Sequence, residues 1–149
     1  MSEINGALSG LKIVACSTAQ AGTVPYMLMA DLGAEVIKIE TPGKGDNNRN
    51  SGFLEGEIGS FFETNNRGVK SLTLNLKSEK GQKILHSLIK EADVFAQNFR
   101  PGVAEKLNFD YETLSKINPK IVYASVSAYG PDAPDGHLPG TDAVGQALS

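Results

Sequence analysis

The chain has 149 residues, of which 40% are hydrophobic and 21% are charged, and its formal net charge is -3. This length suits one hydrophobic core, and the composition is that of an ordinary globular domain rather than a disordered or membrane-embedded segment. The acidic balance argues against a broad nucleic-acid-binding surface, although a local basic patch could still hold a small anion.

The distribution of apolar residues and cysteine favours a cytoplasmic protein. The opening residues, MSEINGALSG, include an acid and lack an apolar run, so we expect no secretory signal. The longest apolar stretch, around residues 26–32, is too short to span a bilayer, and we expect no membrane partner. Cys16 is the only cysteine, which excludes an intrachain disulfide and fits a reducing compartment.

The first half of the chain predicts a strand, a helix and a second strand, with a polar loop after each strand. The predicted elements are a strand over 11–15, a loop over 16–21, a helix over 22–32, a strand over 35–40 and a loop over 41–50. Gly33 stands where a glycine ends a helix. The poor periodicity of residues 51–68 predicts no regular element.

The second half continues the alternation of strands and helices. The predicted elements are a strand over 71–76, a helix from Ser78 to before Asp93, a strand over 93–97, helices over 103–107 and 111–117, and a strand over 121–126. Asp110 suits the N-cap of the helix over 111–117. Thr141 suits the N-cap of a last helix that would continue to residue 148.

This order of elements predicts one α/β domain, Rossmann-like and doubly wound around a mainly parallel sheet. The sequence stops at Ser149, within the helix that follows Thr141, and its last residues lack the glycine, proline or basic last turn that commonly ends a helix. We therefore expect residues 1–149 to be the N-terminal part of a longer protein, truncated at the C-terminus.

The stretch DVFAQNFRPG, residues 93–102, holds the most informative candidate site. It predicts a buried strand that feeds a loop, and in an open α/β sheet ligands bind where strands end. Asn98 can donate and accept hydrogen bonds, Phe99 can stack on a planar ring, and Arg100 can bind a phosphate or carboxylate. The alternative is a capped turn with a solvated arginine.

Other patterns argue against a dinucleotide-binding site, a metal site and a reactive cysteine. The loop after the first strand lacks the glycine fingerprint of dinucleotide binding, which leaves little support for Glu40 as a ribose-binding acid. His86 and His137 have no partners at ligand spacing, so no metal site is predicted. Cys16 is expected to be buried and inert. A set of basic residues either converges on a polyanion or forms a solvated face: Arg67, Lys70, Lys77 and Lys80.

Taken together, several stretches resemble the family III CoA-transferases, which include formyl-CoA transferase, the carnitine CoA-transferase and α-methylacyl-CoA racemase. The stretches are LSGLKIVACSTAQAG, DLGAEVIKIETPGKGD, NNRGVKSLTLNLKSEKGQKIL, EADVFAQNFRPGVAEKL, YETLSKINPKIVYASVSAYG and LPGTDAVGQALS. They cover residues 8–149. DLGAEVIKIE, SLTLNLKS and NFRPG in this order and spacing make the resemblance highly specific.

The resemblance implies an N-terminal domain that binds coenzyme A, within a longer chain that forms an interlocked homodimer. The positions that match the family's CoA contacts are Ala19, Gln20, Leu74, Lys77, Asn98, Phe99 and, more weakly, Lys106. The residue chemistry agrees, because Phe99 and Leu74 suit a ring or pantetheine surface, whereas Lys77 and Arg100 suit phosphates. Acyl-CoA and a carboxylic acid are the implied substrates, with no tightly bound cofactor.

The resemblance also implies covalent catalysis by an aspartate, through a mixed anhydride and an aspartyl-CoA thioester. That aspartate lies beyond Ser149 in the family, so none of residues 1–149 is expected to be the nucleophile. Gln20, near the acyl group, and Asp142 are the supporting candidates. Thr41 replaces an arginine found in many members, which places one phosphate contact in doubt.

Three functions remain open from the sequence. Thr141 stands where the family's racemases have a histidine, so transfer of CoA is favoured over racemisation. The alternatives are a racemase or lyase relative, and a CoA-binding fragment without catalysis. We expect residues 1–149 to be inactive in transfer without the missing nucleophile.

Overall fold

The computed structural model describes residues 6–55, 58–130 and 132–148, which form an α/β fold around a parallel sheet. Within these residues the main sheet has five strands in the order β5-β2-β1-β6-β7, and all neighbouring pairs are parallel. The strands are β1 (Lys12–Cys16), β2 (Glu35–Glu40), β5 (Lys70–Thr73), β6 (Val94–Gln97) and β7 (Val122–Ser125). The predicted α/β fold with a mainly parallel sheet is confirmed.

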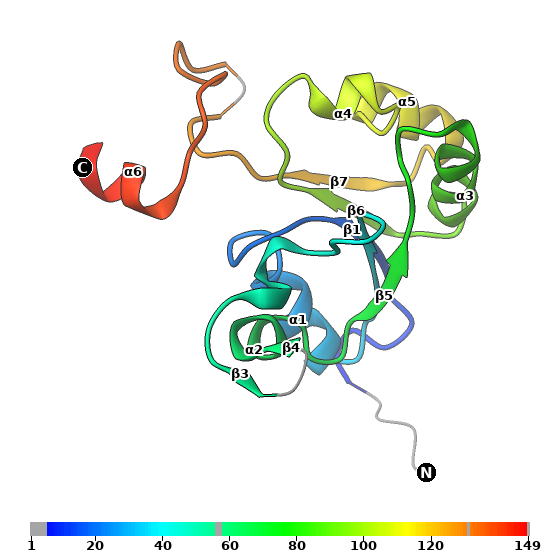
Figure 1. Ribbon diagram of the computed structural model, residues 1–149. Helices are drawn as coiled ribbons and strands as arrows, with labels where there is room; N and C mark the ends of the chain where they lie inside the picture. The colour runs from blue at the N-terminus through cyan, green and yellow to red at the C-terminus, as the bar shows by residue number, and fades with distance from the viewer. Residues whose placement is uncertain (1–5, 56–57, 131, 149) are drawn as a thin grey trace.

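Helices cover both faces of this sheet (Figure 1). They are α1 (Val24–Asp31) and α2 (Ser60–Asn66) on one face, and α3 (Glu79–Ile89), α4 (Val103–Lys106) and α5 (Tyr111–Ile117) on the other. Ile13 packs with Tyr26 of α1, whereas its neighbour Val14 packs with Leu85 of α3 and Leu114 of α5. Alternation along β1 thus divides the core into two layers, which is the doubly wound arrangement.

Local sequence explains where the helices begin. Ser78 accepts a hydrogen bond from the backbone N–H of Gly81 at 3.1 Å, which caps α3. Asp110 accepts from the N–H of Thr113 at 3.0 Å and caps α5 as predicted. α1 begins at Val24, two positions after the predicted start at residue 22, because the residues before Val24 form a hydrogen-bonded turn. Pro25 lies in the first turn of the helix, where a proline is favoured.

The structure corrects several predicted boundaries. β5 covers Lys70–Thr73, whereas the sequence predicted a strand to residue 76, and Cys16 belongs to β1 rather than to the loop. Residues 51–68, for which no element was predicted, contain the paired strands β3 (Leu54–Glu55) and β4 (Ile58–Gly59) and all of α2. These elements are two to seven residues long, too short to show a hydrophobic period.

The helix predicted near the end of the sequence is present as α6 (Asp142–Leu148). Figure 1 shows it apart from the sheet, at the far end of the connection that follows β7. Its side chains from Asp142 to Ala147 are exposed except for the half-buried Val144. None of the helices in the described ranges has the length and apolar character needed to cross a membrane.

Candidate functional site

Most of the candidate residues follow the carboxyl ends of the parallel strands, which meet at one edge of the sheet. We call this region the carboxyl edge, and it comprises the connections over residues 17–23, 41–46, 74–78, 98–102 and 126–130. Gln20 follows β1, Lys77 follows β5, and Asn98 and Phe99 follow β6. Ligands of open α/β sheets bind at this edge, so topology alone brings these candidates to one region.

The connection after β1 is a tight loop in an unusual conformation. Ala19 has a φ of 58°, which is left-handed and strained for a residue with a side chain. The hydroxyl of Thr23 donates to the carbonyl of Ala19, and the backbone N–H of Thr23 donates to the carbonyl of Gln20 at 3.1 Å. The Gln20 side chain is exposed at the tip of this loop, where it is accessible to a ligand.

Asn98 joins the loop after β6 to the loop after β1. Its Nδ2 donates to the carbonyl of Thr18 at 2.7 Å, and its Oδ1 accepts from the N–H of Thr18 at 2.9 Å. One N–H and one lone pair of the amide remain for other partners. Asn98 therefore connects these two loops by hydrogen bonds within the protein.

The Gln97 side chain holds the loop after β6 through hydrogen bonds. The Gln97 side chain is buried, accepts from the N–H of Phe99 at 2.7 Å and donates to the hydroxyl of Ser125 in β7 at 2.8 Å. Gly102 has a φ of 83°, which turns the chain sharply into α4. The Arg100 side chain between these fixed points is exposed, so its guanidinium is accessible to an anion.

A cavity of about 170 Å³ opens beside this loop, and we call it the aromatic cavity. Its lining includes the rings of Phe99, Tyr111 and Tyr123 together with Gln97 and Arg100. Burial raises the pKa of the Tyr123 phenol to about 12, so this group is neutral at physiological pH. The lining also includes the acidic residues Glu105 and Asp110, so the cavity offers flat apolar walls beside charges of both signs.

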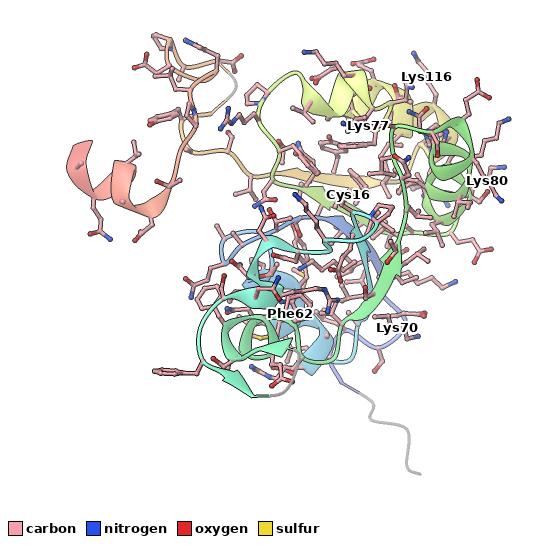
Figure 2. All side chains as sticks on the ribbon, viewed as in Figure 1. Cys16, Phe62, Lys70, Lys77, Lys80 and Lys116 are labelled. Atoms are coloured by element: carbon pink, nitrogen blue, oxygen red, sulfur yellow. The ribbon has the colours of Figure 1, made fainter. Side chains whose placement is uncertain are left out.

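The other predicted contacts differ in accessibility. Lys77 and Lys106 have exposed side chains, and Lys77 lies on the connection between β5 and α3 (Figure 2). Leu74 is only 9% exposed and packs in the core with Leu85 and Phe95. Its side chain therefore faces the interior, and a ligand could contact it chiefly through its backbone.

A buried network of charges fixes the connection after β2. Lys38 forms a salt bridge with Asp46 and donates to Oδ1 of Asn66 at 2.7 Å. Arg49 makes two hydrogen bonds to the carboxylate of Glu40, at 2.7 and 2.6 Å. Sequence reasoning missed this network, although Lys38 and Glu40 stand at alternate positions of a predicted buried strand, which is a signal that buried charges must find partners.

The carboxylate of Glu40 is fully engaged within the protein. It also accepts from the hydroxyl of Ser71 at 2.6 Å and from the N–H of Asp46 at 2.8 Å. Burial raises the pKa of Glu40, but the hydrogen bonds from Arg49, Ser71 and Asp46 outweigh this and hold it at about 2. Glu40 is therefore a structural anion, and the weakly supported role of ribose-binding acid does not fit its surroundings.

Two residues considered from the sequence lie outside this arrangement. Asp142 is exposed in the first turn of α6, where it accepts from Nε2 of Gln146 at 2.7 Å, and Figure 1 shows α6 away from the sheet. Cys16 is 1% exposed within the sheet, and burial raises the pKa of its thiol, as expected for an inert cysteine (Figure 2).

No metal centre accompanies the carboxyl edge in the part of the chain that the structure describes. Among these residues, no three histidine, cysteine, aspartate or glutamate side chains gather as metal ligands would. The chemical groups at the edge are instead amides, aromatic rings and cations, which suit an organic anion.

Comparison with known proteins identifies the family. A model of CoA-transferase family III matches residues 8–149. The chain belongs to CoA-transferase family III. Acetyl-CoA:oxalate CoA-transferase of Acetobacter aceti is 42% identical over 144 residues, which are 97% of this chain and 37% of that protein. Human succinyl-CoA:glutarate CoA-transferase is 40% identical over 144 residues, which are 95% of this chain and 33% of that protein.

A solved structure of a similar protein has the same fold. The CAIB/BAIF family protein of Brucella suis superposes with a TM-score of 0.91 at 36% identity, over 97% of this chain and 39% of that chain. The chain thus spans about a third of the length of the curated family III relatives it matches. The predicted family resemblance is confirmed over the whole stretch from which it was drawn.

Proposed function

We propose that this chain is the coenzyme A-binding part of a CoA-transferase that moves CoA from an acyl-CoA to a carboxylic acid. The observation that carries the proposal is the family III match over residues 8–149, together with the cations and aromatic ring at the carboxyl edge. The relatives are named for transfer to or from oxalate, glutarate and succinate, which supports a carboxylate acceptor.

The chemistry of the edge suggests how each end of an acyl-CoA would be held. Lys77 and Arg100 at this edge, with Lys106 at the end of α4, are exposed cations that suit its phosphates. Phe99 offers a ring face for an apolar or planar group. Gln20 is exposed on a fixed loop and suits the polar acyl end. The backbone at Ala19 and Leu74 completes the proposed contacts.

The proposed reaction uses an aspartate as the covalent carrier of CoA. Its carboxylate attacks the donor thioester, which gives a mixed anhydride and CoA thiolate, and the thiolate then forms aspartyl-CoA and releases the donor acid. The acceptor carboxylate then attacks aspartyl-CoA, which gives a second mixed anhydride and CoA thiolate, and the thiolate attacks the acceptor acyl carbon to form the acceptor's CoA thioester and release the aspartate. Residues 1–149 supply binding and orientation, with Asp142 in a supporting role. We propose a cytoplasmic, interlocked homodimer as the working form of the whole enzyme.

Calorimetric titration of the chain with CoA tests the binding part of this proposal. We expect saturable binding, weakened about tenfold by Lys77→Ala or Arg100→Ala because each removes one charge-assisted contact. Lys90→Ala is the matched control, since Lys90 is an exposed cation at the end of α3 and lies outside the carboxyl edge. Absence of binding at millimolar CoA, or an equal effect of Lys90→Ala, would contradict the proposal.

A further inference from the structure

The loop after β1 is held by a side chain that lies 80 residues away in the sequence. The amide of Asn98 pairs with Thr18 in the manner of a neighbouring strand, with one bond donated at 2.7 Å and one accepted at 2.9 Å. Thr18 follows β1 by two positions, and Asn98 follows β6 directly. The amide therefore extends the pairing of β1 with β6 beyond the point where the strands end.

This pairing fixes the residue next to Thr18 in its left-handed conformation. The φ of 58° at Ala19 is disfavoured for any residue with a Cβ, and such a conformation persists where surrounding contacts impose it. Asn98 fixes the loop on one side of Ala19, and the Thr23 hydroxyl fixes it on the other through the Ala19 carbonyl. Gln20 is the next residue, so its position depends on both contacts.

Gly22 provides the space that the Asn98 amide occupies. A Cβ at position 22 would lie 2.5 Å from Nδ2 of Asn98 and 2.8 Å from the carbonyl oxygen of Thr18. Both atoms belong to the hydrogen bonds just described. The pairing of Asn98 with Thr18 therefore depends on both residues. A side chain at position 22, or the loss of the amide at position 98, would disrupt it.

We propose that Asn98 is a positioning residue, which acts through Thr18 to hold Ala19 and Gln20 in place. The meaning of this loop for acyl-CoA rests on the function proposed above, whereas the positioning itself does not. In this assignment the Asn98 amide acts through its two hydrogen bonds to Thr18, and not through the N–H and the lone pair that remain for other partners.

Amide hydrogen exchange measured by NMR tests the positioning without any ligand. In Asn98→Ala we expect the N–H of Thr18 to exchange about tenfold faster, because its acceptor is lost, while amides of β1 and β2 keep their protection. Gly22→Ala should give the same local pattern. The control is Asn50→Ala, an exposed asparagine at the end of η1 (Asn47–Asn50), which should leave the Thr18 exchange rate unchanged.

Two exchange results would overturn the proposal. One is an unchanged exchange rate at Thr18 in both variants, which would mean that Asn98 does not hold the loop. The other is a uniform increase over β1, β2 and the loop, which would reduce Asn98 to a general contributor to stability.

A double-mutant cycle with acetyl-CoA as the titrated ligand then separates positioning from direct contact. If Asn98 acts through Gln20, Asn98→Ala should weaken binding severalfold in the parent chain and little in a Gln20→Ala background. Equal losses in both backgrounds would show that Asn98 contacts the ligand independently and would overturn the proposal. If the parent chain binds no acetyl-CoA, the proposed function fails, and the exchange rates still decide the role of Asn98.

Discussion

At the scale of single residues, the charges of β2 show how polar groups are stabilised inside this core. Lys38 and Glu40 are 2% and 4% exposed, so an unpaired charge at either position would be strongly destabilising. Each has an oppositely charged partner from the next connection, Asp46 for Lys38 and Arg49 for Glu40. The guanidinium carbon of Arg49 lies 4.0 Å from the centroid of the Phe62 ring in α2, which adds a cation–π contact. The network thereby connects the carboxyl end of β2 to α2.

Replacement of Glu40 should change how stability depends on pH. The folded pKa of Glu40 is about 2, below its ordinary value of 4.5, so its contribution is present above pH 4.5 and is lost as the pH falls toward 2. The difference corresponds to about 3 kcal/mol at most. We expect urea unfolding of Glu40→Gln to show a lower free energy at pH 7 and a flatter decline between pH 5 and 3.

The matched control for this prediction is Glu63→Gln, because Glu63 is exposed on α2. It should leave both the free energy of unfolding and its pH dependence close to those of the parent chain. An identical pH dependence in Glu40→Gln and the parent would contradict the role assigned to the network.

At the scale of elements, the cap of α5 is a contact that the sequence predicts and the structure describes in atomic detail. Asp110 accepts from the N–H of Thr113 at 3.0 Å and from its hydroxyl at 2.7 Å. α5 buries Leu114 completely against the sheet, so fraying of its first turn would loosen the core beside the aromatic cavity.

Removal of this cap should destabilise the fold moderately. We expect Asp110→Ala to lower the free energy of unfolding by about 1 kcal/mol, since the N–H of Thr113 loses its acceptor. Glu112→Ala in the same first turn is the control, with an expected loss of only a few tenths of a kcal/mol because it makes a dipole interaction at most. Urea unfolding of both variants at pH 7 measures the difference, and equal losses would argue against the cap.

The elements that the sequence predicts correctly are those with a clear period or an end signal. β1, β2, β6 and β7 are apolar runs bounded by polar loops, and α3 follows Ser78 with apolar residues at helical spacing. The hairpin and α2 within residues 51–68 escaped prediction because their short segments depend on tertiary contacts, such as those between Phe62 and the Lys38 and Arg49 charges.

The candidate site residues could be selected from the local sequence, whereas the contacts between them could not be predicted. Residue type and position after a strand were enough to select Gln20, Asn98, Phe99 and Arg100 as candidates. The bridge from Asn98 to Thr18 could not be predicted, because it depends on β1 and β6 being neighbours in the sheet. Alternation of apolar residues over 71–76 did indicate burial of Leu74, but the sequence could not show that its side chain packs in the core with Leu85 of α3.

At the scale of the whole molecule, the proposed ligand and the protein carry charges of the same sign. The chain has a net charge of -3, and coenzyme A carries several negative phosphate charges. Binding must therefore depend on the local cations Lys77, Arg100 and Lys106 rather than on long-range attraction. Exposed cations are screened by salt, so the affinity for CoA should fall as ionic strength rises.

The measurement that bears most directly on the central proposal is the map of amide hydrogen exchange with and without saturating CoA. We predict slower exchange over residues 18–22, 74–78 and 98–102, because these connections form the carboxyl edge, and unchanged exchange in α6. Slower exchange confined to other parts of the chain, or no change at a CoA concentration that saturates binding, would contradict a CoA site at this edge.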